Sequence, residues 1–206
     1  LVTADTNYRF YNRNNYMLSL GLTSRTYSKD RFILQYGRTE DIPTGSTLWG
    51  VLGHQSGEFK NRKYIGGNYA RGGYVEGFGY LNTIYSFGGF ISKSGFEDGV
   101  IKVGADYFTK LFTLNQFKFR QFIDVTFAQS IDPSEEPIIS SHNNLGVRGL
   151  RGIFLRSTSK FNVKFESLLF TPMNVLGFRL ALFGFLDYSA VGNHKSDFFN
   201  SESYVG

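Results

Sequence analysis

The feature that most limits what this chain can fold into is a regular alternation of apolar and polar residues. Between residues 116 and 127 the two sets of alternate positions differ sharply in character. One set contains Phe117, Phe119, Gln121, Ile123, Val125 and Phe127, and the other contains Lys118, Arg120, Phe122, Asp124 and Thr126. A period of two is typical of a β-strand with one apolar and one polar face. Because residues 101–107 and 161–166 alternate in the same way, we predict an all-β, antiparallel fold.

The predicted strands are long, and their connections are of two kinds. We expect nine strands, at about 15–28, 31–40, 47–59, 64–76, 82–93, 99–112, 116–130, 153–170 and 176–190. Compact turns at 41–46, 77–81, 114–115 and 171–174 form one set. The other set comprises the tips at 27–31, 60–63 and 95–99 and the long segment 131–152. Short turns on one side and longer loops on the other are typical of a transmembrane β-barrel.

Aromatic residues favour the membrane barrel over a soluble antiparallel sandwich, whose strands would also alternate. Phe, Tyr and Trp make up 17% of the residues, whereas charged residues make up 19%, below the roughly 25% usual in soluble domains. Many of the aromatic residues fall near strand ends, as an interfacial girdle requires. We therefore expect one set of side chains to face lipid, namely Phe117, Phe119, Ile123, Phe161, Val163 and Phe165. The set expected to face the lumen is Lys118, Arg120, Asp124, Lys164 and Glu166.

Several kinds of function are disfavoured by composition. The chain has no cysteine, and His54, His142 and His194 lie far apart, so we expect neither a metal site nor a cofactor. Ser140 and Ser141 are adjacent to His142, but adjacency in a loop does not position a nucleophile and a base, and we do not expect an enzyme. The net charge is +5, yet the basic residues are scattered and do not indicate nucleic-acid binding.

One motif stands at the end of the longest predicted loop, Gly146-Val147-Arg148-Gly149-Leu150-Arg151-Gly152. It resembles the Val-Arg-Gly signature of the bacterial outer-membrane assembly and two-partner-secretion superfamily, which includes BamA and TamA. Residues 160–166 resemble the twelfth strand of that family, and residues 185–189 resemble its Phe-x-Asp-x-Gly strand. Two positions depart from the family pattern, because Leu150 replaces the commoner aromatic residue and Ser189 replaces the glycine.

The resemblance implies a sixteen-stranded barrel, of which residues 1–206 would be a segment running from about strand five to strand thirteen, incomplete at both ends. Segment 131–152 would be an extracellular loop that folds into the lumen, on the same side as residues 60–63 and opposite Pro43 and Pro172. Arg148 would pair with Asp187 or Glu166 as an ionic lock, with Gly146, Val147, Gly149 and Leu150 as the rest of the loop motif. A guanidinium group suits such a carboxylate clamp.

The implied function is to insert outer-membrane proteins, or to translocate a polypeptide, in the outer membrane of a bacterial cell. The implied partners are membrane lipid, an unfolded client polypeptide and accessory assembly subunits. Two alternatives remain open: a passive porin or solute channel with a basic lumen, and a surface-exposed structural or adhesin barrel.

Overall fold

The computed structural model describes residues 12–133, 139–140, 147–148, 156–192 and 202–205, and within these residues the protein consists of β-strands without helices. The strands are β1 (Arg13–Arg31), β2 (Thr39–Gly57), β3 (Asn61–Val75), β4 (Gly79–Ser92), β5 (Gly95–Thr109), β6 (Phe112–Leu114), β7 (Phe117–Ile131), β8 (Ile139–Ser140), β9 (Arg156–Ser157), β10 (Ser159–Val175), β11 (Phe178–Gly192) and β12 (Glu202–Val205). No helix in this described part is long and apolar enough to cross a membrane.

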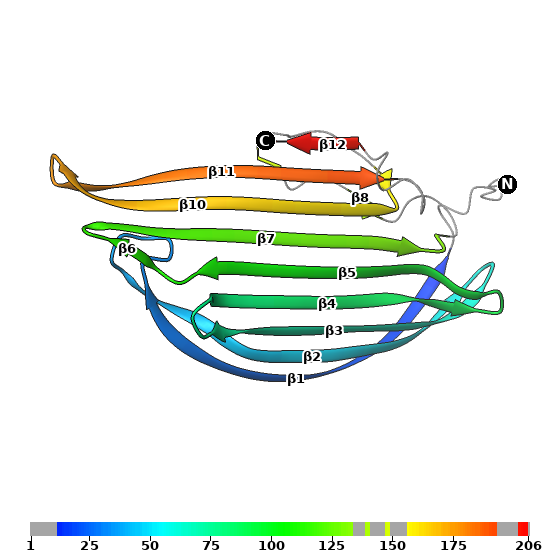
Figure 1. Ribbon diagram of the computed structural model, residues 1–206. Coiled ribbons are helices and arrows are strands. Elements are labelled where there is room, and N and C mark those ends of the chain that lie inside the picture. Colours follow the sequence, from blue (N-terminus) through cyan, green and yellow to red (C-terminus); the bar gives the residue numbers. More distant parts are fainter. Residues whose placement is uncertain (1–11, 134–138, 141–146, 149–155, 193–201, 206) are drawn as a thin grey trace.

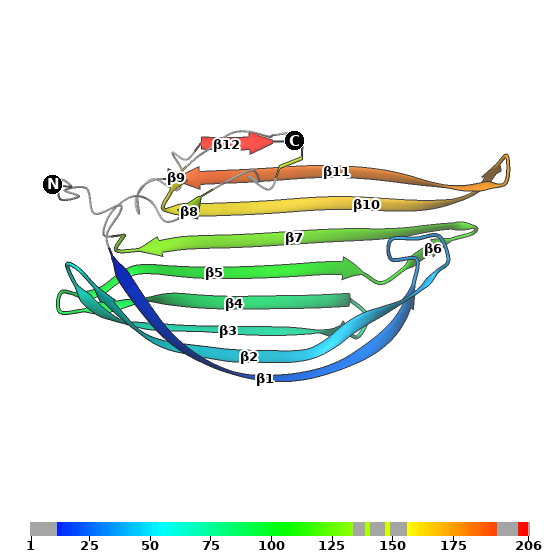
Figure 2. The ribbon, with the colours of Figure 1, turned by 180° about the vertical axis from the view of Figure 1, so that it is seen from behind.

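Ten of these strands form one antiparallel sheet (Figures 1 and 2). Its order is β1-β2-β3-β4-β5-β7-β10-β11-β12, with β6 paired to β7, while β8 and β9 form a separate short pair. The sheet is open, because β1 and β12 are its two edges among the described residues. The sheet is also strongly curved, and β1 and β2 bend away from the direction of the other strands. The predicted all-β, antiparallel fold is confirmed.

The curvature brings distant strands together across one face, which we call the inner face. Arg120 of β7 bonds Asp30 of β1 across it, although four strands lie between β1 and β7 in the sheet order. Tyr74 of β3 also donates a hydrogen bond to Asp30. The cross-strand pairings place the predicted polar residues of β7 and β10 on this inner face. The predicted lipid-facing residues of the same two strands lie on the opposite, outer face, as the alternation requires.

Eight predicted strands are present, but the prediction of a strand at 31–40 is wrong. Residues 32–38 are the loop between β1 and β2, and Phe32 and Gly37 there have φ angles of 58° and 68°. The predicted turn at 41–46 is wrong as well, because it lies inside β2 and pairs continuously with β1. Tyr27–Arg31 is likewise not a tip but the end of β1, at the end of the sheet opposite to the one we predicted.

Gly45 explains how β2 holds the sequence that resembles a turn. Its φ is 129°, and pairing of β2 with β3 begins only at this residue. Between Gly45 and Gly57 the even-numbered Leu48 and Leu52 lie on the outer face. On the N-terminal side of Gly45 the even-numbered Ile42 packs against residues of the inner face. The alternation therefore changes phase near Gly45, and the β1–β2 hairpin turns in over the inner face.

The long connection lies where the strand order predicted. β7 ends at Ile131 at the same end of the sheet as the β2–β3 turn, and Pro43 and Pro172 lie near the other end, so the side from which this connection starts is confirmed. The predicted turn at 171–174 is wrong, because residues 171–173 form an irregularity within β10 and the turn follows at Leu176 and Gly177. A bulge tolerates Pro172, which has no N–H to donate to the ladder.

Candidate functional site

Arg148 reaches two carboxylates on the inner face. Its backbone N–H donates a hydrogen bond to Asp187 Oδ2 over 2.9 Å, and its Nε lies 3.4 Å from the same oxygen. One terminal nitrogen of its guanidinium group donates to Oε1 of Glu166. The structure thus brings together the three residues that the motif singled out, with Asp187 held through both main chain and side chain.

The two neighbouring strands place the carboxylates side by side. Glu166 lies on β10 directly opposite Phe185 of β11, and Lys164 lies directly opposite Asp187. Residues two apart along a strand share a face, so Glu166 and Asp187 form a diagonal pair on the inner face. A single arginine can therefore reach both. The pairing of β10 with β11 alone sets the positions of the two carboxylates, and Arg148 is the residue that the connection between strands contributes.

Two aromatic rings complete the surroundings of Arg148. Its guanidinium carbon lies 4.5 Å from the ring centre of Phe185 and 5.6 Å from that of Phe183, within the range of cation–π contacts. Phe183, Phe185 and Asp187 are each two residues apart along β11, so both rings lie on the same face as Asp187. Neither phenylalanine was expected from the sequence to have a role, although the spacing of both from Asp187 was a usable signal.

The burial of the three charged groups is unequal. The Asp187 side chain is 0% exposed, compared with 32% for Arg148 and 31% for Glu166. Oδ1 of Asp187 has no hydrogen-bond partner in the described part of the chain. A buried carboxylate without a compensating cation is costly, so Asp187 depends on Arg148 more than Glu166 does. The hydroxyl of Ser189, two residues along β11 from Asp187, donates a hydrogen bond to Oδ1 of Asn162.

The remaining predicted site residues are only partly described. Val147 is buried, which places the described residues 147–148 against the inner face. Gly146, Gly149 and Leu150 lie outside the described residues, as do His142 and His194. Where the chain is described, no cluster of three or more His, Asp or Glu side chains could hold a metal ion.

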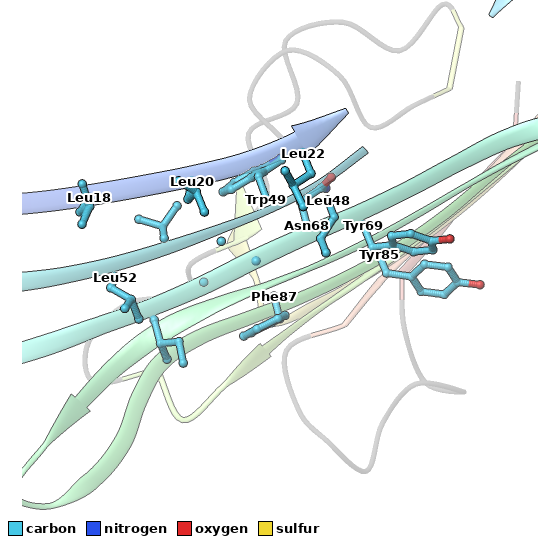
Figure 3. Close-up of a pocket in the computed structure, with 15 residues that line it drawn as sticks. Leu18, Leu20, Leu22, Leu48, Trp49, Leu52, Asn68, Tyr69, Tyr85 and Phe87 are labelled. Atoms are coloured by element: carbon cyan, nitrogen blue, oxygen red, sulfur yellow. The ribbon is translucent and has the colours of Figure 1, made fainter. Parts of the chain in front are cut away.

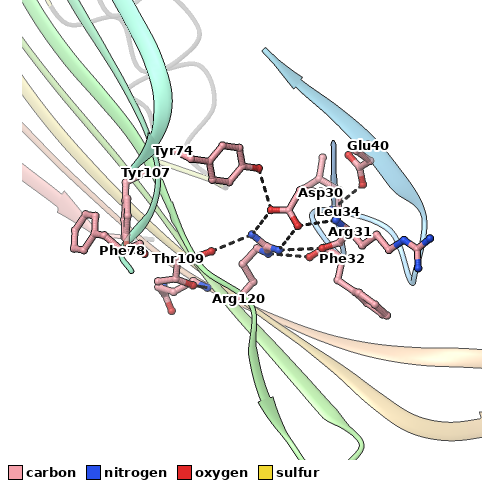
Figure 4. Close-up of polar contacts among 11 residues, drawn as sticks. Asp30, Arg31, Phe32, Leu34, Glu40, Tyr74, Phe78, Tyr107, Thr109 and Arg120 are labelled. Atoms are coloured by element: carbon pink, nitrogen blue, oxygen red, sulfur yellow. Dashed lines mark hydrogen bonds and ion pairs between the residues drawn. The ribbon is translucent and has the colours of Figure 1, made fainter. Parts of the chain in front are cut away.

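A second charged cluster, which was not expected from the sequence, surrounds Arg120 (Figure 4). Arg120 lies on β7 opposite Leu168 of β10, two residues from Glu166. The alternation placed Arg120 on the polar face but did not indicate a partner. Its guanidinium group donates to both carboxylate oxygens of Asp30 over 3.2 Å. It also donates to three carbonyl oxygens, those of Arg31, Phe32 and Thr109, over 2.9–3.0 Å. Arg120 is fully buried, and all its donor directions are used.

The outer face carries many exposed apolar side chains, and Figure 3 shows those around one part of it. A shallow depression there, of about 640 Å³, is lined by side chains of β1 to β4. Gly50 and Gly67 contribute no side chains to it, which leaves the space between its walls. Its exposed apolar walls are formed by Leu18, Leu20, Leu22, Leu48, Leu52, Tyr85 and Phe87. Exposed leucines continue on β11 at Leu182 and Leu186. An exposed apolar area of this extent is typical of an interaction surface.

Comparison of the chain with protein-family models, with curated proteins and with solved structures finds no match. The assignment of function therefore depends on the two faces of the sheet and on the Arg148 site.

Proposed function

We propose that this chain is a segment of a bacterial outer-membrane β-barrel that inserts outer-membrane proteins or translocates a polypeptide. The observation that carries the proposal is the docking of Arg148 onto Glu166 and Asp187 from a long connection between strands. Such a contact holds a loop inside the curve of the sheet, as the family resemblance implies.

Lipid contact by the outer face is part of the proposal. Every backbone group inside a bilayer needs a hydrogen-bond partner, and a continuous antiparallel ladder supplies these partners between strands. The long strands carry apolar side chains on the outer face and most of their charged side chains on the inner face. This division suits hydrocarbon on one side and a polar lumen on the other.

A pair of adjacent substitutions tests the lipid-facing side. Leu20 is 79% exposed on the outer face, and its neighbour Ser19 points to the inner face. In lipid vesicles, Leu20→Arg is expected to lower the free energy of unfolding by about 2–4 kcal/mol, because it puts a charge into hydrocarbon. Ser19→Arg is expected to change it by less than about 1 kcal/mol. Urea unfolding followed by the fluorescence of Trp49, the single tryptophan, measures both. Equally small changes in the free energy of unfolding for the two variants would mean that Leu20 faces water.

The functional test uses the full-length protein and the Arg148 site. Arg148→Ala is expected to reduce insertion of a client barrel protein into vesicles, or secretion of a polypeptide, at least about tenfold. The variant should still form its sheet, since the strand ladders do not include Arg148. Lys102→Ala is the matched control, because it removes one exposed inner-face charge away from the site. Client insertion at the normal rate by Arg148→Ala would contradict the proposal.

Exchanging the charges provides a second, more specific test of direct pairing. Arg148→Asp combined with Asp187→Arg should restore part of the activity that each single substitution removes. A passive channel with a basic lumen is less well supported by the structure. Arg120, one of the cations that such a channel would use to attract anions, is fully buried and paired with Asp30.

A further inference from the structure

The loop between β1 and β2 crosses the inner face near the end of the sheet opposite to the β2–β3 turn. We call residues 32–38 the hairpin tip. Ile33 of the tip packs with Tyr80 of β4 and Phe108 of β5 in a buried cluster. The hydroxyl of Tyr36 donates to the carbonyl of Thr171 in β10 over 3.0 Å, 135 residues away in sequence. The tip therefore extends from its own strands to the far side of the curved sheet.

Aromatic contacts hold the tip on that far side. Phe32, Tyr36 and Phe170 of β10 form a three-ring cluster with centres 5.1–5.6 Å apart in edge-to-face geometry. Two inner-face cations lie over the tip rings, Lys118 over Phe32 and Arg179 over Tyr36. Edge-to-face aromatic pairs add stability beyond their buried area.

Arg120 is the polar anchor of the same loop. Four of its five acceptor atoms belong to residues 30–32, namely both carboxylate oxygens of Asp30 and the carbonyl oxygens of Arg31 and Phe32. Tyr74 of β3 adds a hydrogen bond to Asp30 over 2.9 Å. In Figure 4 Arg120 reaches from β7 across to the end of β1. Removing its side chain takes this donor from the carbonyls of Arg31, Phe32 and Thr109 and takes the paired cation from the Asp30 carboxylate.

We infer that the hairpin tip is a plug that closes the inner space at the end of the sheet opposite to the β2–β3 turn, and that Arg120 is its latch. The inference rests on the proposed function, because a plug has a purpose only if the inner space is a passage. When the tip leaves, Phe32, Ile33 and Tyr36 lose their apolar contacts, and Arg120 loses its acceptors in residues 30–32. The closed position is therefore the stable one, and a polypeptide or accessory subunit that opens the passage must supply the difference.

A cysteine-accessibility experiment tests the position of the tip. The sequence has no cysteine, so an introduced thiol reports one position. Ile33 is 5% exposed and its neighbour Leu34 is 67% exposed. In the full-length protein in lipid vesicles, Ile33→Cys should react with a maleimide much more slowly than Leu34→Cys. Adding Arg120→Ala should speed the reaction of Ile33→Cys roughly 10- to 100-fold, because the lost latch raises the population of the released tip.

Conductance across a planar lipid bilayer tests whether the tip blocks the passage. Arg120→Ala should raise single-channel conductance or open time at least about tenfold, in parallel with the labelling. The double variant Phe32→Ala with Tyr36→Ala keeps the latch but removes the tip rings, and it should act in the same direction. This double variant still tests the plug if the Arg120→Ala variant does not fold. Lys102→Ala removes the same charge from the inner face outside the tip contacts and should leave both readouts unchanged.

Two results would overturn the plug. If Ile33→Cys stays protected in both the latch variant and the ring variant, Arg120 and the rings do not hold the tip. If the thiol becomes reactive but conductance does not change, the tip is released without opening a passage. Neither result depends on client insertion, which the Arg148 variants measure, so failure of the plug and failure of the proposed function are separable.

Discussion

Replacing Arg148 with alanine is expected to lower the free energy of unfolding by about 3–5 kcal/mol, the range found when one partner of a buried ion pair is removed. The reason is Asp187, whose side chain is fully buried and forms an ion pair with Arg148. Glu166→Gln should cost only about 0–1 kcal/mol, because both groups of that pair are about one-third exposed and water screens them.

Urea unfolding of the two variants in lipid vesicles measures this difference. A double-mutant cycle then isolates each pair: the coupling free energy between Arg148 and Asp187 should exceed that between Arg148 and Glu166. Equal costs for Arg148→Ala and Glu166→Gln would mean that water reaches Asp187 and that burial does not set the strength of the site.

Gly45→Ala is expected to destabilise the protein by about 2–4 kcal/mol, through backbone strain together with a steric clash. At a φ of 129° an L side chain is strained, and an added Cβ would lie 2.1 Å from the carbonyl oxygen of Ser24 in β1. The clash is with backbone, so a change of rotamer cannot relieve it. The paired strands would have to separate where the hairpin turns inward.

Gly50→Ala is the matched control for Gly45→Ala in the same strand. An added Cβ at Gly50 meets its nearest atom, the carbonyl oxygen of Gly66, at an ordinary 3.9 Å. It should change the free energy of unfolding by less than about 1 kcal/mol, because fewer conformations in the unfolded chain offset small packing costs. The same unfolding measurement applies, and similar costs for both glycines would show that Gly45 has no special conformational role.

Much of the sheet was predictable because its signal is local. Alternation with a period of two specifies both that a segment is extended and which side chains share a face. The segments of β3, β7 and β11 were placed close to their observed bounds for this reason. The meeting of Arg148 with Asp187 and Glu166 was also accessible, since the motif indicated the arginine and strand parity placed both carboxylates on one face.

The hairpin between β1 and β2 shows what a local pattern does not reveal. Residues 31–40 alternate like a strand, but partners far away in sequence hold the tip, among them Arg120 and Phe170. Pro43 and Gly45 suggest a turn, yet a 19-residue pairing with β1 overrides that preference. Pro43 is tolerated because β3 does not pair with β2 beyond Gly45, so no neighbour there needs its missing N–H.

The sequence by itself therefore determined the all-β character, the two faces and the three charged residues of the Arg148 site. Only the tertiary structure decided that β1 and β2 continue past Gly45, that their tip turns inward and that Arg120 is buried against it. The physical reason is the range of the interactions. Alternation acts between neighbours in one strand, whereas the tip is stabilised by contacts that exist only after the sheet has curved.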